Sequence, residues 1–284
     1  MATFTNQAAL SYNGIVTNSN ITTGEIIAVL SMTKTALSTT YDAGGDVTYV
    51  ISIRNTGSTP YTDLTLTDNL GAYEFNTNTL VPLTYIHDSI LYYVNGALQP
   101  TPTITSQSPL TVTGITVPAN GNATIIYETD INSFAPLGTG AEINNTASIT
   151  GNGVITPITA EETISASTEP FLTISKAMSP NVVSENGELT YTFTIQNFGS
   201  DATTVDDDVV LTDTFNPVLK NIDVTYNGGA WVERASYNYD TSTGLFTTLP
   251  GQITVPGATF TQDINTGMYI TTPGIVTITV TGTI

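Results

Sequence analysis

The stretch GDVTYVISIRNTG at residues 45–57 returns as GELTYTFTIQNFG at residues 187–199. In both copies apolar and polar side chains alternate, and β-branched residues are frequent. A period of two predicts an antiparallel strand with one face buried in a core. Because the same strand occurs twice at a wide separation, the sequence predicts two copies of one β domain.

The repeat extends on both sides of this strand. Thr33-Lys34-Thr35 matches Ser175-Lys176-Ala177, and LTLTDNL at residues 64–70 matches VVLTDTF at residues 209–215. No long amphipathic helix is evident, and 284 residues suit about two domains. We therefore predict an all-β protein with two tandem immunoglobulin-like β-sandwiches at residues 29–168 and 169–284. An N-terminal donor strand or hairpin at residues 1–28 precedes them.

One repeated segment stands at an unexpected place. FTNQAALSYNGIVT at residues 4–17 matches INNTASITGNGVIT at residues 143–156, where the segment closes the first repeat. The second repeat reaches Ile284 without such a segment. We therefore expect the second sandwich to be incomplete and to accept the N-terminal segment of a neighbouring subunit. The donor strand would present Phe4, Asn6, Ala8 and Leu10.

Closing the second sandwich within one chain is the competing arrangement. Residues 20–30 would then have to span the whole first sandwich, but ten extended residues reach at most about 35 Å. A contact between neighbouring copies that does not close produces an open filament. The sequence thus predicts a homopolymer of identical subunits. Two alternatives remain: the leading strand pads the first sandwich, or the chain is a fragment of a monomeric multi-repeat cell-surface stalk or adhesin.

These motifs together resemble a bacterial surface-repeat family catalogued as domain of unknown function eleven. Its repeats show a lysine on the first strand, a G-D-x-V-T-Y stretch, a T-D-x-L corner and a closing N-x-A strand, here at residues 34, 45–49, 67–70 and 145–147. The resemblance implies immunoglobulin-like sandwiches, a structural role at a cell or spore surface, and no enzyme activity. The leading N-x-A segment and the unclosed second repeat depart from the family pattern.

The repeated polar residues also suggest a covalent lock. Lysine, asparagine and a buried acid together resemble the isopeptide domains of bacterial pili and adhesins. A buried lysine loses its charge, and its neutral amine can attack an asparagine carbonyl while a carboxyl group shuttles protons. The candidates are Lys34 and Asn145 with Asp68 or Asp46, and, between two chains, Lys176 and Asn6 with Asp213 or Glu188.

Ordinary structural roles are the alternative for these residues. A lysine on a first strand commonly protects a sheet edge. An asparagine near a strand end commonly bonds to the backbone, and an aspartate at a corner commonly caps a turn.

The composition limits the remaining functions. Five basic and 24 acidic residues give a net charge of −19, which disfavours nucleic acid and anionic lipid as partners. No cysteine, membrane-length apolar run or signal peptide is visible, so we expect no membrane insertion and no disulfide. Asp206, Asp207 and Asp208 are weak calcium candidates, but a solvated acidic loop explains them better. The single histidine, His87, makes a Ser-His-Asp triad improbable, and no cofactor motif appears.

Overall fold

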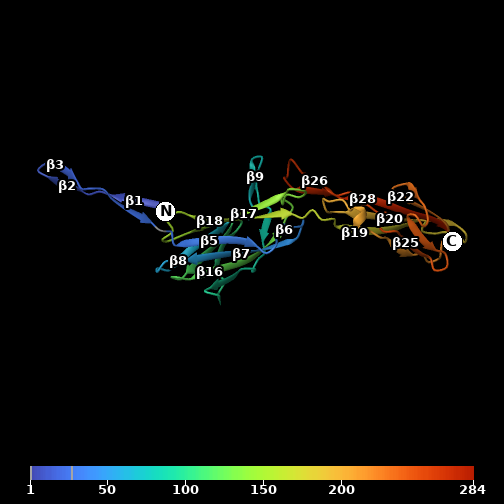
Figure 1. The fold of residues 1–284 in the computed structure, drawn as a ribbon, viewed down its shortest axis with the longest axis horizontal. Coiled ribbons are helices and arrows are strands. Elements are labelled where there is room, and N and C mark those ends of the chain that lie inside the picture. The colour runs from blue at the N-terminus through green and yellow to red at the C-terminus, as the bar shows by residue number, and fades with distance from the viewer. Residues whose placement is uncertain (1, 27) are drawn as a thin grey trace.

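The computed structural model describes residues 2–26 and 28–284, and it has three parts along one long axis (Figure 1). A slender arm (residues 2–26) projects from one end of domain one (residues 28–168). Domain two (residues 169–284) continues from the other end. Strands dominate the described residues, and the one helical element is the short 3₁₀ turn η1 (Val205–Asp207). The structure confirms the predicted all-β class.

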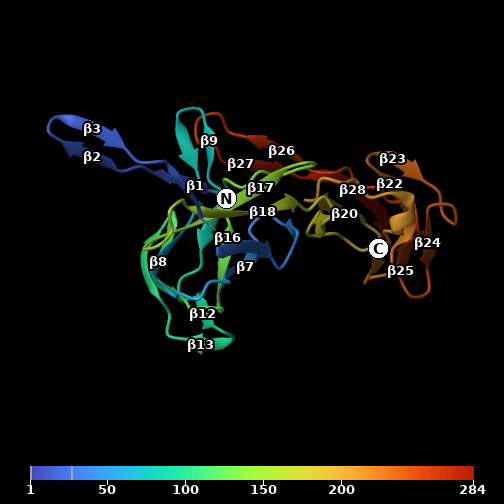
Figure 2. The same ribbon diagram turned by 60° about the vertical axis from the view of Figure 1, so that its left-hand side comes forward.

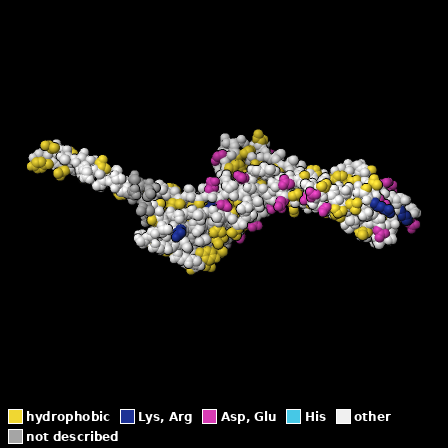
Figure 3. Space-filling view, viewed as in Figure 1, with side chains coloured by type: hydrophobic (Ala, Val, Ile, Leu, Met, Phe, Trp, Pro, Cys, Tyr) yellow, Lys and Arg dark blue, Asp and Glu magenta, His cyan; other side chains and the backbone are white. Residues whose placement is uncertain are grey.

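The arm is a long β-hairpin. Strand β1 (Ala2–Asn6) pairs with β4 (Thr22–Ile26), and β2 (Ala9–Tyr12) pairs with β3 (Ile15–Asn18). Asn13 and Gly14 both have positive φ at the tip, as a two-residue hairpin turn requires. The arm's apolar side chains lie in solvent, and Figure 3 shows them along its length. They are Phe4, Leu10, Tyr12, Ile15, Val16 and Ile21.

Domain one is a complete sandwich of two six-stranded sheets, with its core between them. The first sheet has the order β13-β12-β16-β7-β5, with β11 also paired to β16. Its strands are β5 (Leu30–Ala36), β7 (Asp46–Asn55), β11 (Leu83–Tyr85), β12 (Leu91–Val94), β13 (Ala97–Gln99) and β16 (Asn122–Ile131). The second sheet has the order β14-β15-β8-β17-β18-β6. Its strands are β6 (Thr40–Tyr41), β8 (Tyr61–Asp68), β14 (Thr103–Gln107), β15 (Leu110–Val117), β17 (Glu142–Thr150) and β18 (Ile158–Ala166).

Domain two repeats five of the six strands of the first sheet in the same order, and β11 has no counterpart among the described residues. The order is β23-β22-β28-β20-β19, formed by β19 (Leu172–Ser179), β20 (Glu188–Asn197), β22 (Lys220–Tyr226), β23 (Gly229–Trp231) and β28 (Gly274–Thr283). Its second sheet is shorter and has the order β24-β25-β21, formed by β21 (Thr212–Thr214), β24 (Tyr237–Asp240) and β25 (Leu245–Thr248). This order matches β14-β15-β8 of domain one and stops where β17 and β18 would follow.

A second hairpin joins the two domains. Strands β26 (Thr259–Gln262) and β27 (Tyr269–Thr272) form it between β25 and β28, where domain one has only the short turn at residues 118–121. We call residues 257–273 the clasp, because Figure 2 shows it lying back along domain one beside the hairpin of β9 (Tyr73–Phe75) and β10 (Asn78–Leu80).

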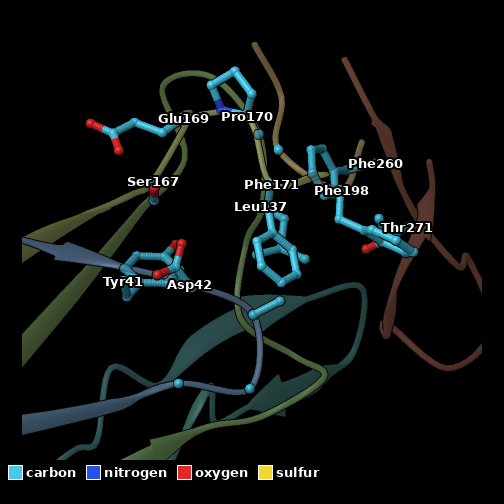
Figure 4. A pocket seen from close by; sticks show the side chains of 15 residues that line it. Tyr41, Asp42, Leu137, Ser167, Glu169, Pro170, Phe171, Phe198, Phe260 and Thr271 are labelled. Atoms are coloured by element: carbon cyan, nitrogen blue, oxygen red, sulfur yellow. The ribbon is translucent and has the colours of Figure 1, made fainter. Parts of the chain in front are cut away.

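Direct contacts fix the clasp to domain one. The backbone N–H of Tyr269 donates to the Ser133 carbonyl at 2.8 Å, and Gln262 Nε2 donates to the Tyr73 hydroxyl at 3.0 Å. Phe260 packs against Gly138. A cavity of about 550 Å³ lies beneath the clasp between the domains, and Figure 4 shows Tyr41, Leu137, Phe171 and Phe198 facing it.

Candidate functional site

A buried polar cluster lies in the core of domain one. Lys34 on β5 donates from Nζ to Asp68 Oδ2 on β8 at 2.6 Å, and neither side chain is exposed. The Tyr127 hydroxyl on β16 donates to the same oxygen at 2.6 Å, and the Leu70 N–H donates to Asp68 Oδ1 at 2.9 Å. The Lys34 ammonium also lies 4.7 Å from the centre of the Tyr49 ring on β7. Two sheets therefore place one amine and one carboxyl in contact, away from water.

Burial changes the protonation of this cluster. It lowers the pKa of Lys34 to about 8, against the opposing attraction of Asp68. It also raises the pKa of Tyr127 well above the ordinary tyrosine value, so that the hydroxyl keeps its proton and remains a donor. A lysine with this pKa gives up its proton far more readily than one in water.

Asn145 on β17 completes the cluster beside the hydroxyl groups of Tyr49 and Tyr127. Its Oδ1 accepts a hydrogen bond from the Gly71 N–H at 3.2 Å. Its Nδ2 is buried and has no hydrogen-bond partner among the described residues. An unsatisfied buried donor costs about 1–3 kcal/mol, so its presence requires an explanation. The asparagine carbonyl is thus polarised while its amino group is unpaired.

Three members of this cluster were missed by the sequence reasoning. Tyr49 and Tyr127 stack at 5.6 Å, and they meet because β7 pairs with β16. Gly71 has a φ of +71°, and a Cβ there would lie 2.5 Å from Ile143. A sequence signal existed for Gly71, since it directly follows the T-D-x-L corner. A signal existed for Tyr49 as well, which recurs as Tyr191 in the repeated strand, whereas no pattern distinguished Tyr127 from other strand tyrosines.

The two other acids considered from the sequence lie elsewhere. Asp46 is exposed at the start of β7, whereas Lys34 pairs with Ile51 near the middle of that strand. Glu188 is likewise exposed at the start of β20, where it pairs with Thr283. Of each pair of alternatives, the structure therefore brings only Asp68 and Asp213 to the lysines.

Domain two contains a counterpart of part of this cluster. Lys176 on β19 donates to Asp213 on β21, and its ammonium lies 4.4 Å from the centre of the Tyr191 ring. These residues hold the strand positions of Lys34, Asp68 and Tyr49, because both lysines pair with the residue two beyond the tyrosine. The side chains of Lys176 and Asp213 are 40% and 20% exposed.

The exposure of Lys176 results from an uncovered sheet. In domain one, β18 lies against β5, and Leu30, Met32 and Lys34 are buried. In domain two no described strand covers β19, and β21 pairs only with β25. We call this surface the open face; Ile174, Lys176 and Met178 on β19 and Asp213 on β21 line it. Ile174 and Met178 are 56% and 40% exposed.

The arm carries the residue types that fill the corresponding place in domain one. By the sequence repeat, Asn6, Ala8 and Leu10 correspond to Asn145, Ala147 and Ile149. These three residues of β17 are fully buried, whereas Asn6, Ala8 and Leu10 are exposed. The arm and the open face belong to opposite ends of the chain in the view of Figure 1.

The calcium candidates and His87 have ordinary structural surroundings. Asp207 accepts hydrogen bonds from the Thr204 N–H and hydroxyl and caps η1. Within the described residues, no three acidic or histidine side chains gather as a metal site would require. His87 pairs with Asp88 in solvent. No helix of residues 2–26 and 28–284 is long and apolar enough to cross a membrane.

No family model and no curated protein matches the chain, so the resemblance to the surface-repeat family stays a prediction. Two pilus proteins of known structure match the chain distantly. The major pilin subunit BcpA of Bacillus cereus has a TM-score of 0.35 and 11% identity, over 96% of this chain and 73% of that chain. The pilus backbone protein RrgB of Streptococcus pneumoniae has a TM-score of 0.35 and 9% identity, over 87% of this chain and 55% of that chain.

A different class of protein also matches distantly. A family 123 glycoside hydrolase of Clostridium perfringens has a TM-score of 0.31 and 14% identity, over 48% of this chain and 27% of that chain. Because β-sandwiches serve many unrelated functions, likeness at this level carries no argument about function. The function has to be argued from the open face, the arm and the polar cluster.

Proposed function

We propose that this protein is the structural subunit of an extracellular or spore-surface filament, assembled head to tail by strand donation. The supporting observation is the strand order. The sheet β24-β25-β21 stops at the position where domain one continues into β17 and β18. The arm of a second copy would occupy this position, with β2 beside β21 and β4 over β19. Sheet addition of this kind supplies main-chain hydrogen bonds along the whole strand.

The apolar surfaces of the two partners are matched in type. The open face exposes Ile174 and Met178, and the arm exposes Ala8 and Leu10. Burying one large apolar side chain contributes about 1.5–3 kcal/mol. In Figure 3 no Lys, Arg, Asp or Glu colour is visible on the outer part of the arm, so apolar contact and hydrogen bonds would dominate binding.

The geometry favours a filament over a closed ring. The arm and domain two extend from opposite ends of domain one (Figures 1 and 2). A copy that donates its arm at one end therefore accepts an arm at the other. Such a heterologous contact continues as an open chain when its rotation does not close.

We further propose that an isopeptide bond stabilises domain one. The proton of the Lys34 ammonium passes to Asp68, and the neutral amine attacks Cγ of Asn145. The Nζ–Cγ bond forms, Asp68 passes its proton to Nδ2, and the Cγ–Nδ2 bond breaks with release of ammonia. As the amide forms, Nζ gives up a second proton, which stays on Asp68. The Gly71 N–H stabilises the developing oxyanion. The unpaired Nδ2 of Asn145 is then the leaving group, which accounts for its lack of a partner.

Deletion of residues 2–26 tests the assembly. We expect electron microscopy to show filaments of the full chain and only monomers of the deletion variant. Circular dichroism should show that the deletion variant keeps the β signal of its two domains, because no described residue of the arm belongs to either core. Monomeric full-length protein at high concentration would contradict the proposal and favour the surface stalk or adhesin.

Intact mass tests the bond inside domain one. We expect the wild-type chain to be lighter than its sequence mass by about 17 Da, the mass of one ammonia. The Asn145→Ala variant should have its full sequence mass. A wild-type mass equal to that of the sequence would contradict the bond and leave the filament proposal untouched.

A further inference from the structure

We propose that docking of the arm completes a second cross-linking site, in which Lys176 of one copy becomes covalently bonded to Asn6 of the next. The inference rests on the proposed strand donation and specifies its chemistry. Each filament junction would then be covalent without any cysteine.

The reacting groups of the acceptor are already in place. Lys176 donates to Asp213, and the amine lies over the Tyr191 ring at 4.4 Å, as Lys34 lies over Tyr49 at 4.7 Å. The strand pairings of β19 with β20 and of β5 with β7 have the same register at these residues. Domain two therefore holds two of the three reacting side chains in the arrangement found in domain one.

The arm supplies the third side chain at the matching position. In domain one Ala147 pairs with Asp68, and Asn145 lies two residues earlier on β17. In the same register Ala8 of the arm pairs with Asp213, and Asn6 then lies two residues earlier on β1. Side chains two residues apart on a strand share a face, so Asn6 would point toward Lys176 as Asn145 does toward Lys34.

The exposure of Lys176 and Asp213 to water explains why this site would react only after the arm has docked. The side chains of Lys176 and Asp213 are 40% and 20% exposed, whereas those of Lys34 and Asp68 are not exposed at all. Water stabilises the ammonium form, which is not a nucleophile. The docked hairpin would exclude this water. A proton of the Lys176 ammonium then passes to Asp213, and the Nζ–Cγ bond forms to Asn6. Asp213 passes this proton to Nδ2, the Cγ–Nδ2 bond breaks with release of ammonia, and the second Nζ proton given up as the amide forms stays on Asp213.

The two cross-linking sites differ at two neighbouring positions. Val280 lies opposite Tyr191, where domain one has Tyr127 opposite Tyr49. Asn216 follows the corner of domain two at the place of Gly71. Asp213 therefore lacks the tyrosine donor that holds Asp68. We expect the junction bond to form more slowly than the bond inside domain one.

Boiling in SDS tests the inference on assembled wild-type filaments. We expect a ladder of resistant oligomers, and peptide mass spectrometry should find Lys176 joined to Asn6 with a loss of about 17 Da. The Asn6→Ala variant should form filaments by electron microscopy but run entirely as monomer after boiling. Its fold is not at risk, because Asn6 is exposed and its side chain makes no hydrogen bond with any described residue.

The matched control is Asn145→Ala, which removes the asparagine of domain one and should keep the ladder. Wild-type filaments that dissolve completely to monomers would overturn the junction bond while leaving strand donation intact. A ladder that persists in Asn6→Ala would overturn the role of Asn6. Absence of wild-type filaments would overturn the strand donation on which the inference depends.

Discussion

At the residue scale, Gly71 combines a backbone conformation that favours glycine with a role in the cluster, since its N–H donates a hydrogen bond to Asn145. Its positive φ disfavours any side chain, and a Cβ would meet Ile143 at 2.5 Å and Pro82 at 3.0 Å. Gly96 has a similar φ of +77° with nothing within 4 Å of a Cβ. An alanine at either glycine would strain the backbone, but only an alanine at Gly71 would also overlap with neighbouring side chains.

We predict that Gly71→Ala destabilises domain one by about 1–3 kcal/mol more than Gly96→Ala, because overpacking adds to the same backbone strain. Urea unfolding of the two variants gives the comparison. Gly71→Ala should also form the bond inside domain one more slowly, as followed by intact mass. Equal destabilisation by both substitutions would show that Gly71 is not tightly enclosed.

The pKa of Lys34 predicts a pH dependence that reports on the bond. The pKa of unbonded Lys34 is about 8 in the folded chain and about 10.5 in the unfolded chain, and the Asn145→Ala variant should keep this difference because burial causes it. The unfolded chain binds more protons in this interval, so stability should rise between pH 8 and pH 10. Above pH 10 the raised pKa values of Tyr49 and Tyr127 act in the opposite direction.

The bonded wild-type chain should lack this rise, because an amide nitrogen does not titrate. Thermal melts at pH 7.5, 8.5 and 9.5 make the comparison. The same increase in Tm for wild type and variant would contradict a bond at Lys34.

Sequence reasoning reached part of this cluster and not the rest. Lys34, Asp68 and Asn145 stand out because the repeat supplies a second copy of the first two, and the arm a copy of the third. The contributions of Tyr127 and Gly71 depend on how β16 and the corner after β8 fold over the lysine. No local pattern encodes such long-range packing.

At the element scale, the arm offers a matched pair of substitutions. Leu10 corresponds to the fully buried Ile149, whereas Val16 corresponds to Ile155, which is 71% exposed. Both arm residues are themselves exposed, at 70% and 64%. Leu10 and Val16 thus have similar exposure in the single chain, but only Leu10 would be buried in the proposed junction, so a comparison of the two tests the junction.

We predict that Leu10→Asp raises the concentration needed for assembly at least about tenfold, since a buried leucine contributes more than 1.4 kcal/mol. Val16→Asp should change it little. Light scattering at increasing protein concentration measures the threshold. Similar thresholds for both variants would contradict the proposed register of the donated strand.

At the scale of the whole molecule, the clasp distinguishes the two kinds of joint in a filament. The joint inside a subunit has the clasp, with hydrogen bonds from Tyr269 and Gln262. The joint between subunits would face residues 118–121 of the incoming domain one, which form only a short turn. The repeat alignment located the insertion but gave no indication that it folds back onto domain one.

We predict that replacing residues 257–273 by the short turn of residues 119–121 loosens the joint between the domains and leaves each core intact. Small-angle scattering should then report a broader distribution of lengths, with unchanged β content by circular dichroism. An unchanged scattering profile would show that the clasp does not fix the joint.

The most direct measurement of the central claim is a cryo-electron microscopy map of the filament at a junction between two subunits. We predict density for the hairpin of residues 2–26 from one copy along β21 and over β19 of the next, with Leu10 buried. An open face left empty, or covered by the arm of its own chain, would contradict assembly by strand donation.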